Sequence, residues 1–492
     1  MMTPSRVRWR GETVWFPALS AVVALAAGCA SRSPFDDALA NLAEYHPHSI
    51  IPDASVNPAI AGLAAESAAE SAPEIERPEG SLTLPAAIDR ALLRNPSTRA
   101  QWERVRAAAA VVERAQSAYL PRIALEGSAG QSRFLYPTTD GAQTSTGFQG
   151  EGAATLTWRL VDFGRRDART ATAAQMLRAT SFDFQRRVQK LVYEVQSAYF
   201  RLAAARVTEE AARMTVEFER TSLADIEEQT VLGLLTRPDA LEARREFTRA
   251  NYEYESARAV TYDARAALAV VLGLPANEAM RVATLDELVV PSGIDASVDA
   301  LVATALGARP DIGAAIARVA AARESVKHAE AEFMPTIDLA GSFGFMDMDL
   351  NSYMPGSSGP ADSFQTQWGI GLEGSWLVYD GGERAATLRG ARASQSEAEH
   401  ELESIRLEAT GEVWDAYFDI VANRRRLEAA EALVASAKDS YDAIHEAYVT
   451  GLTTSTELIE LEASLADARG SYAIAKSGLL ESMARLAYAA GQ

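Results

Sequence analysis

The sequence predicts an outer-membrane type of β-barrel that is continued by a long α-helical coiled-coil barrel, with two internal repeats in each chain. Three observations lead to this prediction. Most of the chain follows one plan twice, four short stretches alternate between apolar and polar residues, and two stretches of about 67 residues lack proline. We expect the repeats at residues 81–275 and 298–492, with a linker at residues 276–297.

The N-terminus has the features of a targeting segment, and residues 1–28 are expected to be a signal peptide. Three arginines precede the apolar stretch from Val14 to Ala27, which ends in "AAGCAS". Cys29 is the only cysteine, so a disulfide within the chain is excluded. The small residues before Cys29 predict a bacterial lipoprotein with a covalent lipid on this cysteine. An ordinary signal peptide with an incidental cysteine is the alternative.

Residues 29–80 are predicted to form an extended, lipidated tether. They are rich in proline, alanine, serine and glutamate, and they show little apolar periodicity. His46 and His48 belong to this segment and are interpreted as an exposed pair, so no metal site is predicted.

The repeats are visible as pairs of similar segments. "AQSAYLPRIALEGSAG" at Ala115 corresponds to "AEAEFMPTIDLAGSFG" at Ala329, an offset of 214 (329 − 115). "WRLVDFGRR" at Trp158 corresponds to "WLVYDGGER" at Trp376, an offset of 218 (376 − 158). Because insertions collect in surface loops, the change in offset predicts a loop between these two landmarks.

Each repeat is expected to contain a short helix, a very long helix and a returning helix. A helix of about 67 residues is roughly 100 Å long at 1.5 Å per residue. Its apolar stripe needs other helices to pack against, as in a coiled coil. The short helices are expected at 84–119 and 298–333, and the long helices at 165–231 and 384–450. The returning helices are expected at 239–272 and 457–488.

Alternating stretches lie between the short and the long helices. In "GEGAATLTWRL", Leu156 and Trp158 share one face, whereas Thr157 and Arg159 lie on the other. About ten residues with this period are typical of a strand with lipid on one side and water on the other. Two ordinary half-buried hairpins are the alternative. The acidic "DMD" stretch at Asp347 is expected in an external loop, where it is solvated.

The doubled motif W-x-[LV]-x-D-x-G-x-R stands where a strand is expected to become a helix. Aspartate accepts hydrogen bonds from the free N–H groups of a helix start, and glycine adopts backbone conformations that other residues avoid. We therefore interpret these corners as structural rather than catalytic. The corner residues are Trp158, Asp162 and Gly164 in the first repeat and Trp376, Asp380 and Gly382 in the second.

Four strands are too few to close a membrane barrel, and open sheet edges are not tolerated in lipid. Three chains would supply twelve strands, so a homotrimer is expected. A formal net charge of −20 argues against nucleic acid as a partner. No motif of a hydrolase, nucleotide-binding enzyme or zinc protease is present, and neither an enzyme nor a cofactor is predicted.

With this architecture the sequence resembles the outer membrane efflux protein (TolC) family, in its lipid-anchored branch. The resemblance covers about residues 80–492 and rests on the doubled order of the corners, the [NR]-P helix entries and the G-L-x-T turns. It implies a trimeric channel-tunnel in a Gram-negative outer membrane that extends into the periplasm. Drugs, metals or secreted proteins would leave through it, supplied by an inner-membrane transporter and a periplasmic adaptor. A non-conducting trimeric stalk or adhesin is the alternative.

The resemblance also implies roles for the turns between the long and the returning helices. They would carry adaptor-contact tips, an acidic ring at the periplasmic entrance and a lock that holds the entrance closed. On the alternative reading, the ring glutamates lie on a solvated outer face, and the tip glycines only permit the turns. The tips are Gly233, Leu234, Thr236, Gly451, Leu452 and Thr454; the ring is Glu457 and Glu460; and the lock is Tyr448 and Asp239.

Overall fold

The computed structural model describes residues 82–138, 141–278, 280–285, 288, 290, 297–350, 361–450 and 452–492, which belong to one compact unit. The expected signal peptide and tether, with Cys29, His46 and His48, lie outside the described residues, and so does Gly451.

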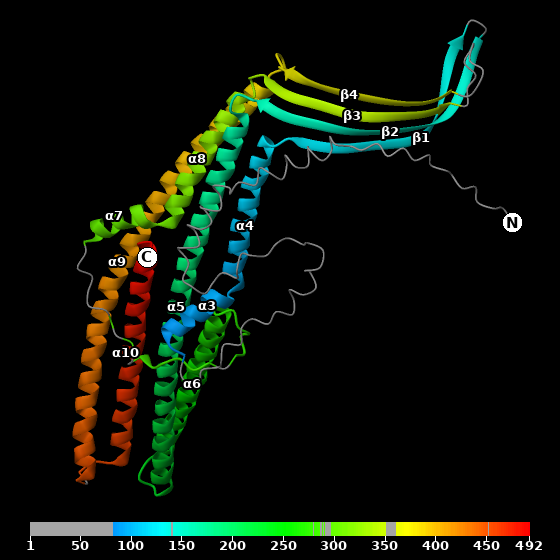
Figure 1. The fold of residues 1–492 in the computed structure, drawn as a ribbon. Helices are drawn as coiled ribbons and strands as arrows, with labels where there is room; N and C mark the ends of the chain where they lie inside the picture. The colour runs from blue at the N-terminus through cyan, green and yellow to red at the C-terminus, as the bar shows by residue number, and fades with distance from the viewer. Residues whose placement is uncertain are drawn as a thin grey trace, which may run out of the picture. The chain divides into compact units, whose positions relative to one another are not determined.

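Two repeats of the same element order build the fold (Figure 1). The first consists of α3 (Leu84–Arg94), α4 (Pro96–Gln116), the 3-10 helix η1 (Ser117–Tyr119), β1 (Arg122–Thr138), β2 (Gly141–Val161), α5 (Arg165–Val231) and α6 (Arg237–Val271). The second consists of α7 (Val298–Ala308), α8 (Pro310–Ala331), β3 (Thr336–Leu350), β4 (Ala361–Ser375), α9 (Glu383–Val449) and α10 (Ser455–Ala489). The predicted helices and strands are found, including both 67-residue helices and both breaks at proline. Asp347 and Asp349 were expected in an external loop, but they lie within β3, because this strand continues to Leu350.

The strands form one antiparallel sheet in the order β1-β2-β3-β4, so the two repeats meet where β2 pairs with β3. The strands are longer than the ten residues that were expected, at 15 to 21 residues. The sequence alternation is clear only near the corners, and pairing continues beyond it. A register shift between Arg159 and Val161 marks a bulge next to the first corner.

One face of the sheet is apolar and largely exposed in the single chain. On β4, Trp368 is 77% exposed and Leu372 is 70% exposed, and Phe343 of β3 lies on the same face. The neighbouring positions on the other face carry Gln367 and Glu373. This is the two-sided pattern that lipid outside and water inside require.

The helical core is centred on the middle of α5, where the predicted stripe of Leu191, Val195 and Tyr199 is fully buried. The Tyr199 hydroxyl donates to the Leu82 carbonyl at 2.8 Å and accepts from the Ala283 backbone N–H at 3.1 Å. The linker between the repeats is therefore fastened to α5 together with the residue that leads into α3. A second core surrounds Val413 of α9, as the repeat predicts.

Each repeat is closed by the same contact between its helix entry and the end of its returning helix. The Asn95 side chain donates to the Val271 carbonyl at 2.8 Å, and Arg309 donates to the Ala489 carbonyl at 3.2 Å. Glycines follow these carbonyls, at Gly273 (φ +71°) and Gly491 (φ +83°). A Cβ at either glycine would come within about 3 Å of the entry backbone, so only glycine fits.

Among the described residues no single helix has both the length and the apolar composition of a membrane span. The pair α7 and α8, bent by 46° at its break, passes that test only when taken together.

Candidate functional site

The first corner is held by a buried ion pair inside the doubled motif. The Asp162 carboxylate accepts from the Arg166 backbone N–H at 3.0 Å and from its Nε at 2.8 Å. The guanidinium also donates to the carbonyls of Arg159, Leu160 and Ala118, at 2.6, 3.2 and 3.4 Å. One arginine thus ties the last strand residues, the start of α5 and the end of the preceding helix together.

The second corner repeats this arrangement. The Asp380 carboxylate accepts from the Arg384 backbone N–H at 3.1 Å, from its Nε at 2.5 Å and from the Gly382 N–H at 3.0 Å. These hydrogen bonds, with that from the arginine side chain the strongest, lower the pKa of Asp380 to about 2. The carboxylate is therefore charged at every physiological pH.

Each corner tryptophan fastens its strand end to the preceding helix, and Trp158 lies on the apolar side of the sheet, opposite Leu339. The Trp158 indole donates to the Tyr119 carbonyl at 2.8 Å, and the Trp376 indole donates to the Phe333 carbonyl at 3.1 Å. The corner arginine lies over the ring of the same aromatic residue, at 4.9 Å in the first corner and 5.1 Å in the second. Such cation–π contacts add to the ion pairs.

Backbone conformation explains the glycine of the motif. Gly164 and Gly382 each precede the first helical residue with φ of +89° and +94°. Other residues adopt this left-handed region only at a cost. The structural interpretation of the corners therefore agrees with their geometry. The importance of the two arginines was missed, although the motif contains them.

The turn between α5 and α6 contains the first set of tip residues. Gly233 has φ of +74°, and the Leu234 N–H donates to the Gln229 carbonyl at 2.9 Å, which closes the end of α5. The Asp239 carboxylate accepts from the Thr236 N–H at 2.8 Å and from its hydroxyl at 2.7 Å. These bonds form a capping box and hold the pKa of Asp239 below its usual range.

The turn between α9 and α10 is built in the same way. The Leu452 N–H donates to the Ala447 carbonyl at 2.8 Å. Thr454 and Glu457 form the capping box of α10, with bonds of 3.3 and 3.4 Å. Glu457 therefore occupies the repeat position of Asp239, and both acids start a returning helix. The Thr453 hydroxyl is buried and has no hydrogen-bond partner among the described residues.

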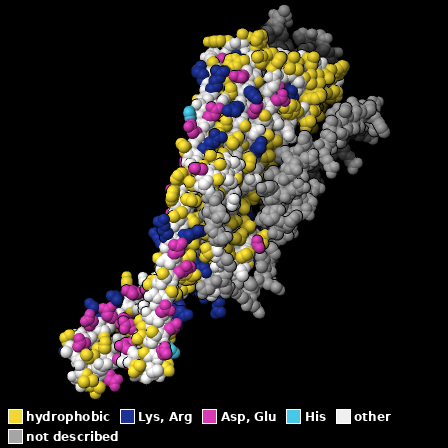
Figure 2. Space-filling model, turned by 90° about the vertical axis from the view of Figure 1, so that its left-hand side faces the viewer, with side chains coloured by type: hydrophobic (Ala, Val, Ile, Leu, Met, Phe, Trp, Pro, Cys, Tyr) yellow, Lys and Arg dark blue, Asp and Glu magenta, His cyan; other side chains and the backbone are white. Residues whose placement is uncertain are grey.

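Apolar side chains stand exposed at both turns. Leu234 is 71% exposed and Leu452 is 82% exposed, next to Val231 and Val449 at 87% and 72%. Figure 2 shows this end of the molecule, away from the sheet, with apolar side chains at the tip and acidic side chains gathered around it. Leucines that cover no core of their own chain are available to a partner.

The residues assigned to the entrance lie on different helices close to the tips. Glu457 and Glu460 are exposed, and Tyr448 is 43% exposed. Burial, followed by the charges of Glu246 and Glu460, raises the pKa of Glu219 on α5. Acidic groups of three helices therefore meet above the tips. The described part of this single chain contains no hydrogen bond between Tyr448 and Asp239.

Comparison with known proteins identifies the family. A family model described as outer membrane efflux protein matches residues 87–274 and 301–492. The chain belongs to the outer membrane efflux protein family. It is 29% identical over 437 residues to Protein CyaE of Bordetella pertussis, and the aligned region covers 88% of this chain and 89% of CyaE.

Solved structures of outer-membrane channels share the fold. The Campylobacter jejuni CmeC outer membrane channel superposes with a TM-score of 0.69 at 20% identity, over 89% of this chain and 94% of that chain. The outer-membrane channel OprN gives 0.66 at 24% identity, over 83% and 89%. This outer membrane efflux protein is thus an export channel of the Gram-negative outer membrane, with the predicted barrel-and-tunnel fold. Members of the family are channels rather than enzymes, and the stalk or adhesin is not favoured.

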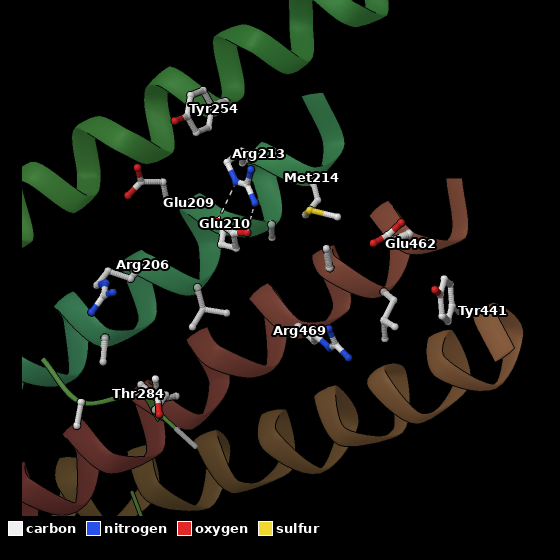
Figure 3. Close-up of a pocket in the computed structure, with 17 residues that line it drawn as sticks. Arg206, Glu209, Glu210, Arg213, Met214, Tyr254, Thr284, Tyr441, Glu462 and Arg469 are labelled. Atoms are coloured by element: carbon white, nitrogen blue, oxygen red, sulfur yellow. Dashed lines mark hydrogen bonds and ion pairs between the residues drawn. The ribbon is translucent and has the colours of Figure 1, made fainter. Parts of the chain in front are cut away.

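A groove of about 740 Å³ lies where α5 and α10 meet, beside the linker (Figure 3). Both signs of charge line it. Arg213 donates to Glu210 at 2.5 and 3.0 Å, and Arg206 donates to the Val282 carbonyl of the linker at 3.2 Å. Because its charges are balanced, the groove shows no preference for one sign of ligand. Among the residues that the structure describes, no cluster of three histidine, cysteine or acidic side chains is arranged for a metal ion.

Proposed function

We propose that three copies of this chain close one twelve-stranded barrel, whose lumen continues into a tunnel made of the long helices. The observation that carries this proposal is the four-stranded sheet with an exposed apolar face and two free edges, β1 and β4. Free edges leave backbone groups without partners, which lipid does not tolerate. Edge pairing between chains satisfies these groups, and the polar face then lines the pore.

At the other end, the exposed leucines of the tips meet a periplasmic adaptor that connects the channel to an inner-membrane transporter. Their exposure in a rigid, capped turn supports this role. Leu234 and Leu452 project from the two turns of the same chain, so each protomer offers two similar contact points. Gly233, Thr236 and Thr454 shape these turns, as Gly451 would by sequence.

The entrance is governed by acidic residues next to the tips. Glu457 and Glu460, brought together by threefold symmetry, form a negative ring that attracts cations. Tyr448 and Asp239 hold the entrance closed in the resting state. In this proposal Asp239 and Glu457 have two tasks, because each also caps a returning helix.

The N-terminal part anchors the channel. Signal peptide cleavage after residue 28 leaves Cys29 as the lipidated first residue, residues 29–80 serve as its tether, and residues 276–297 link the two repeats. The solitary cysteine after a short apolar stretch supports this proposal. Absence of labelled palmitate from Cys29→Ala, with incorporation into the parent, is the expected result; equal labelling would contradict it.

Single-channel recording in planar bilayers tests the export channel directly. The full-length protein is expected to conduct with cation preference, and trivalent cations on the periplasmic side are expected to block it. Replacing both Glu457 and Glu460 with glutamine is expected to weaken the block. An unchanged block would place the glutamates outside the pore, whereas the absence of any conductance would favour a stalk.

A further inference from the structure

A second, smaller groove lies below the first corner, between α4, α5 and α8. Its volume is about 260 Å³. Its lining combines an apolar floor with two cationic side chains. Val111, Ala115, Ala173 and Met176 form the floor, and the cationic side chains are Arg114 on α4 and Arg169 on α5. Val111 and Met176 are 42% and 45% exposed, so the floor is open to a ligand.

The two arginines of this groove carry charges that no neighbouring described side chain neutralises. Within the described ranges, neither Arg114 nor Arg169 has an ion pair or a hydrogen-bond acceptor for its guanidinium. In the larger groove of Figure 3, by contrast, Arg213 is neutralised by Glu210. In a chain with a formal charge of −20, two unneutralised guanidinium groups beside an apolar floor form a local site for an anion.

In the trimer proposed above, helix geometry would turn the groove toward the interior of the tunnel. The Trp158 indole, on the apolar side of the sheet, bonds to the Tyr119 carbonyl, and the Tyr119 hydroxyl bonds to Asp167 of α5. Asp167 therefore marks the outer side of α5. Arg169 follows two residues later, which places it about 200° around a helix of 3.6 residues per turn. It points away from the lipid side.

The fold does not require these arginines. At the repeat offsets, the position of Arg114 is taken by His328 and that of Arg169 by Thr387, while Met176 is replaced by Ser394. The second corner forms the same hydrogen bonds around Asp380 without them. The arginine pair is thus a feature of the first repeat, whereas Ser325 and His328 of α8 complete the lining of the groove.

We propose that this groove is a lumenal binding site for organic anions in which a carboxylate or sulfonate is attached to a small apolar body. The guanidinium groups of Arg114 and Arg169 bind the anion, since Arg pairs with such groups through several N–H donors. The apolar body lies against Val111 and Met176. The site rests on the export function, because it needs a hollow tunnel, and it adds a substrate class that passes through it.

The test measures binding of naphthalene-1-sulfonate to the detergent-solubilised full-length protein by titration calorimetry. The variant Arg114→Gln/Arg169→Thr removes both cations and places the repeat-equivalent threonine at the second position. Arg178→Gln is the matched control, because it lies on α5 about 20° from Asp167 on the outer side. The double variant is expected to bind about tenfold or more weakly, and the control to bind as the parent does.

Two further measurements keep the outcome clear. Val111→Ser, which copies its repeat partner Ser325, is expected to weaken binding of the sulfonate but not of inorganic sulfate. Equal binding by parent and double variant, or equal loss in Arg178→Gln, would overturn the site. Conductance is recorded separately: a parent protein that binds the sulfonate but does not conduct would contradict the export function and leave the site intact.

Discussion

Removal of the buried carboxylate at the first corner is expected to be one of the most damaging single changes. The side chain of Asp162 is 6% exposed and that of Arg166 is 14% exposed, and their closest atoms are 2.8 Å apart. In Asp162→Ala the guanidinium keeps its three carbonyl acceptors but loses the carboxylate with which it forms its ion pair. The Arg166 backbone N–H, at the start of α5, also loses its acceptor.

The expected decrease in the free energy of unfolding follows from these two losses. Breaking a buried ion pair from one side costs about 3–5 kcal/mol, which includes the remaining unpaired charge. Asp162→Asn keeps an oxygen for the backbone N–H and loses only the charge, so its cost is that of a charge-assisted hydrogen bond, about 1.5–3 kcal/mol. The exposed Asp89 provides a control, since Asp89→Asn is expected to change stability by about 0.5 kcal/mol or less.

The assay is thermal unfolding of the full-length protein in detergent, followed by far-UV circular dichroism at one protein concentration. We expect the order of stability parent and Asp89→Asn, then Asp162→Asn, then Asp162→Ala. If Asp162→Ala unfolds together with the parent, the corner ion pair does not hold strand and helix together, and the interpretation of the doubled motif is wrong.

Three further predictions concern other parts of the chain. The pKa of Asp380 is lowered to about 2 in the folded chain, so the carboxylate stabilises the fold above its unfolded pKa, and this contribution is lost as the pH falls from about 4 toward 2. The unfolding midpoints of Asp380→Asn and the parent should therefore differ at neutral pH and converge at the acid end of a pH series. Gly273→Ala is expected to destabilise the protein by about 1–3 kcal/mol, because its Cβ would lie 2.8 Å from the Arg94 carbonyl oxygen and φ is +71°. Gly390→Ala is the control: a Cβ at this helical position has nothing within 4 Å, so stability is expected to stay unchanged or to rise slightly. Equal effects of the two substitutions would refute this explanation. Leu452→Asp is expected to leave assembly and conductance intact and to abolish pull-down of the adaptor, and unchanged pull-down would place the contact elsewhere.

The fold was predictable because each sequence pattern occurs twice, so an element predicted in one repeat can be checked against the equivalent segment of the other. Proline-free runs marked α5 and α9 almost to the residue, and the doubled motif located both corners. A single copy of "WRLVDFGRR" carries little information, but its second occurrence after 218 residues fixes the element order. The strand lengths escaped prediction, because backbone pairing continues where side-chain alternation fades.

The site was predictable only in part, because several of its contacts join residues that are far apart in the sequence. Gly273 and Gly491 look like ordinary helix-ending glycines in the sequence. Their close approach to the entry residues Asn95 and Arg309 appears only in the folded chain. The capping role of Glu457 could have been found from "TSTE", in which a threonine precedes the acid by three residues. The unneutralised charge of Arg114 and Arg169 has no signature in the sequence at all.

The central claim is that four strands of each chain become part of a barrel shared by three chains. Light scattering of the detergent-extracted full-length protein after size-exclusion chromatography measures the number of chains per particle most directly. The account predicts a single species of three chains that retains its helix and strand content by circular dichroism. A monodisperse monomer with the same secondary structure would contradict it, because the free edges of β1 and β4 would then have no partner.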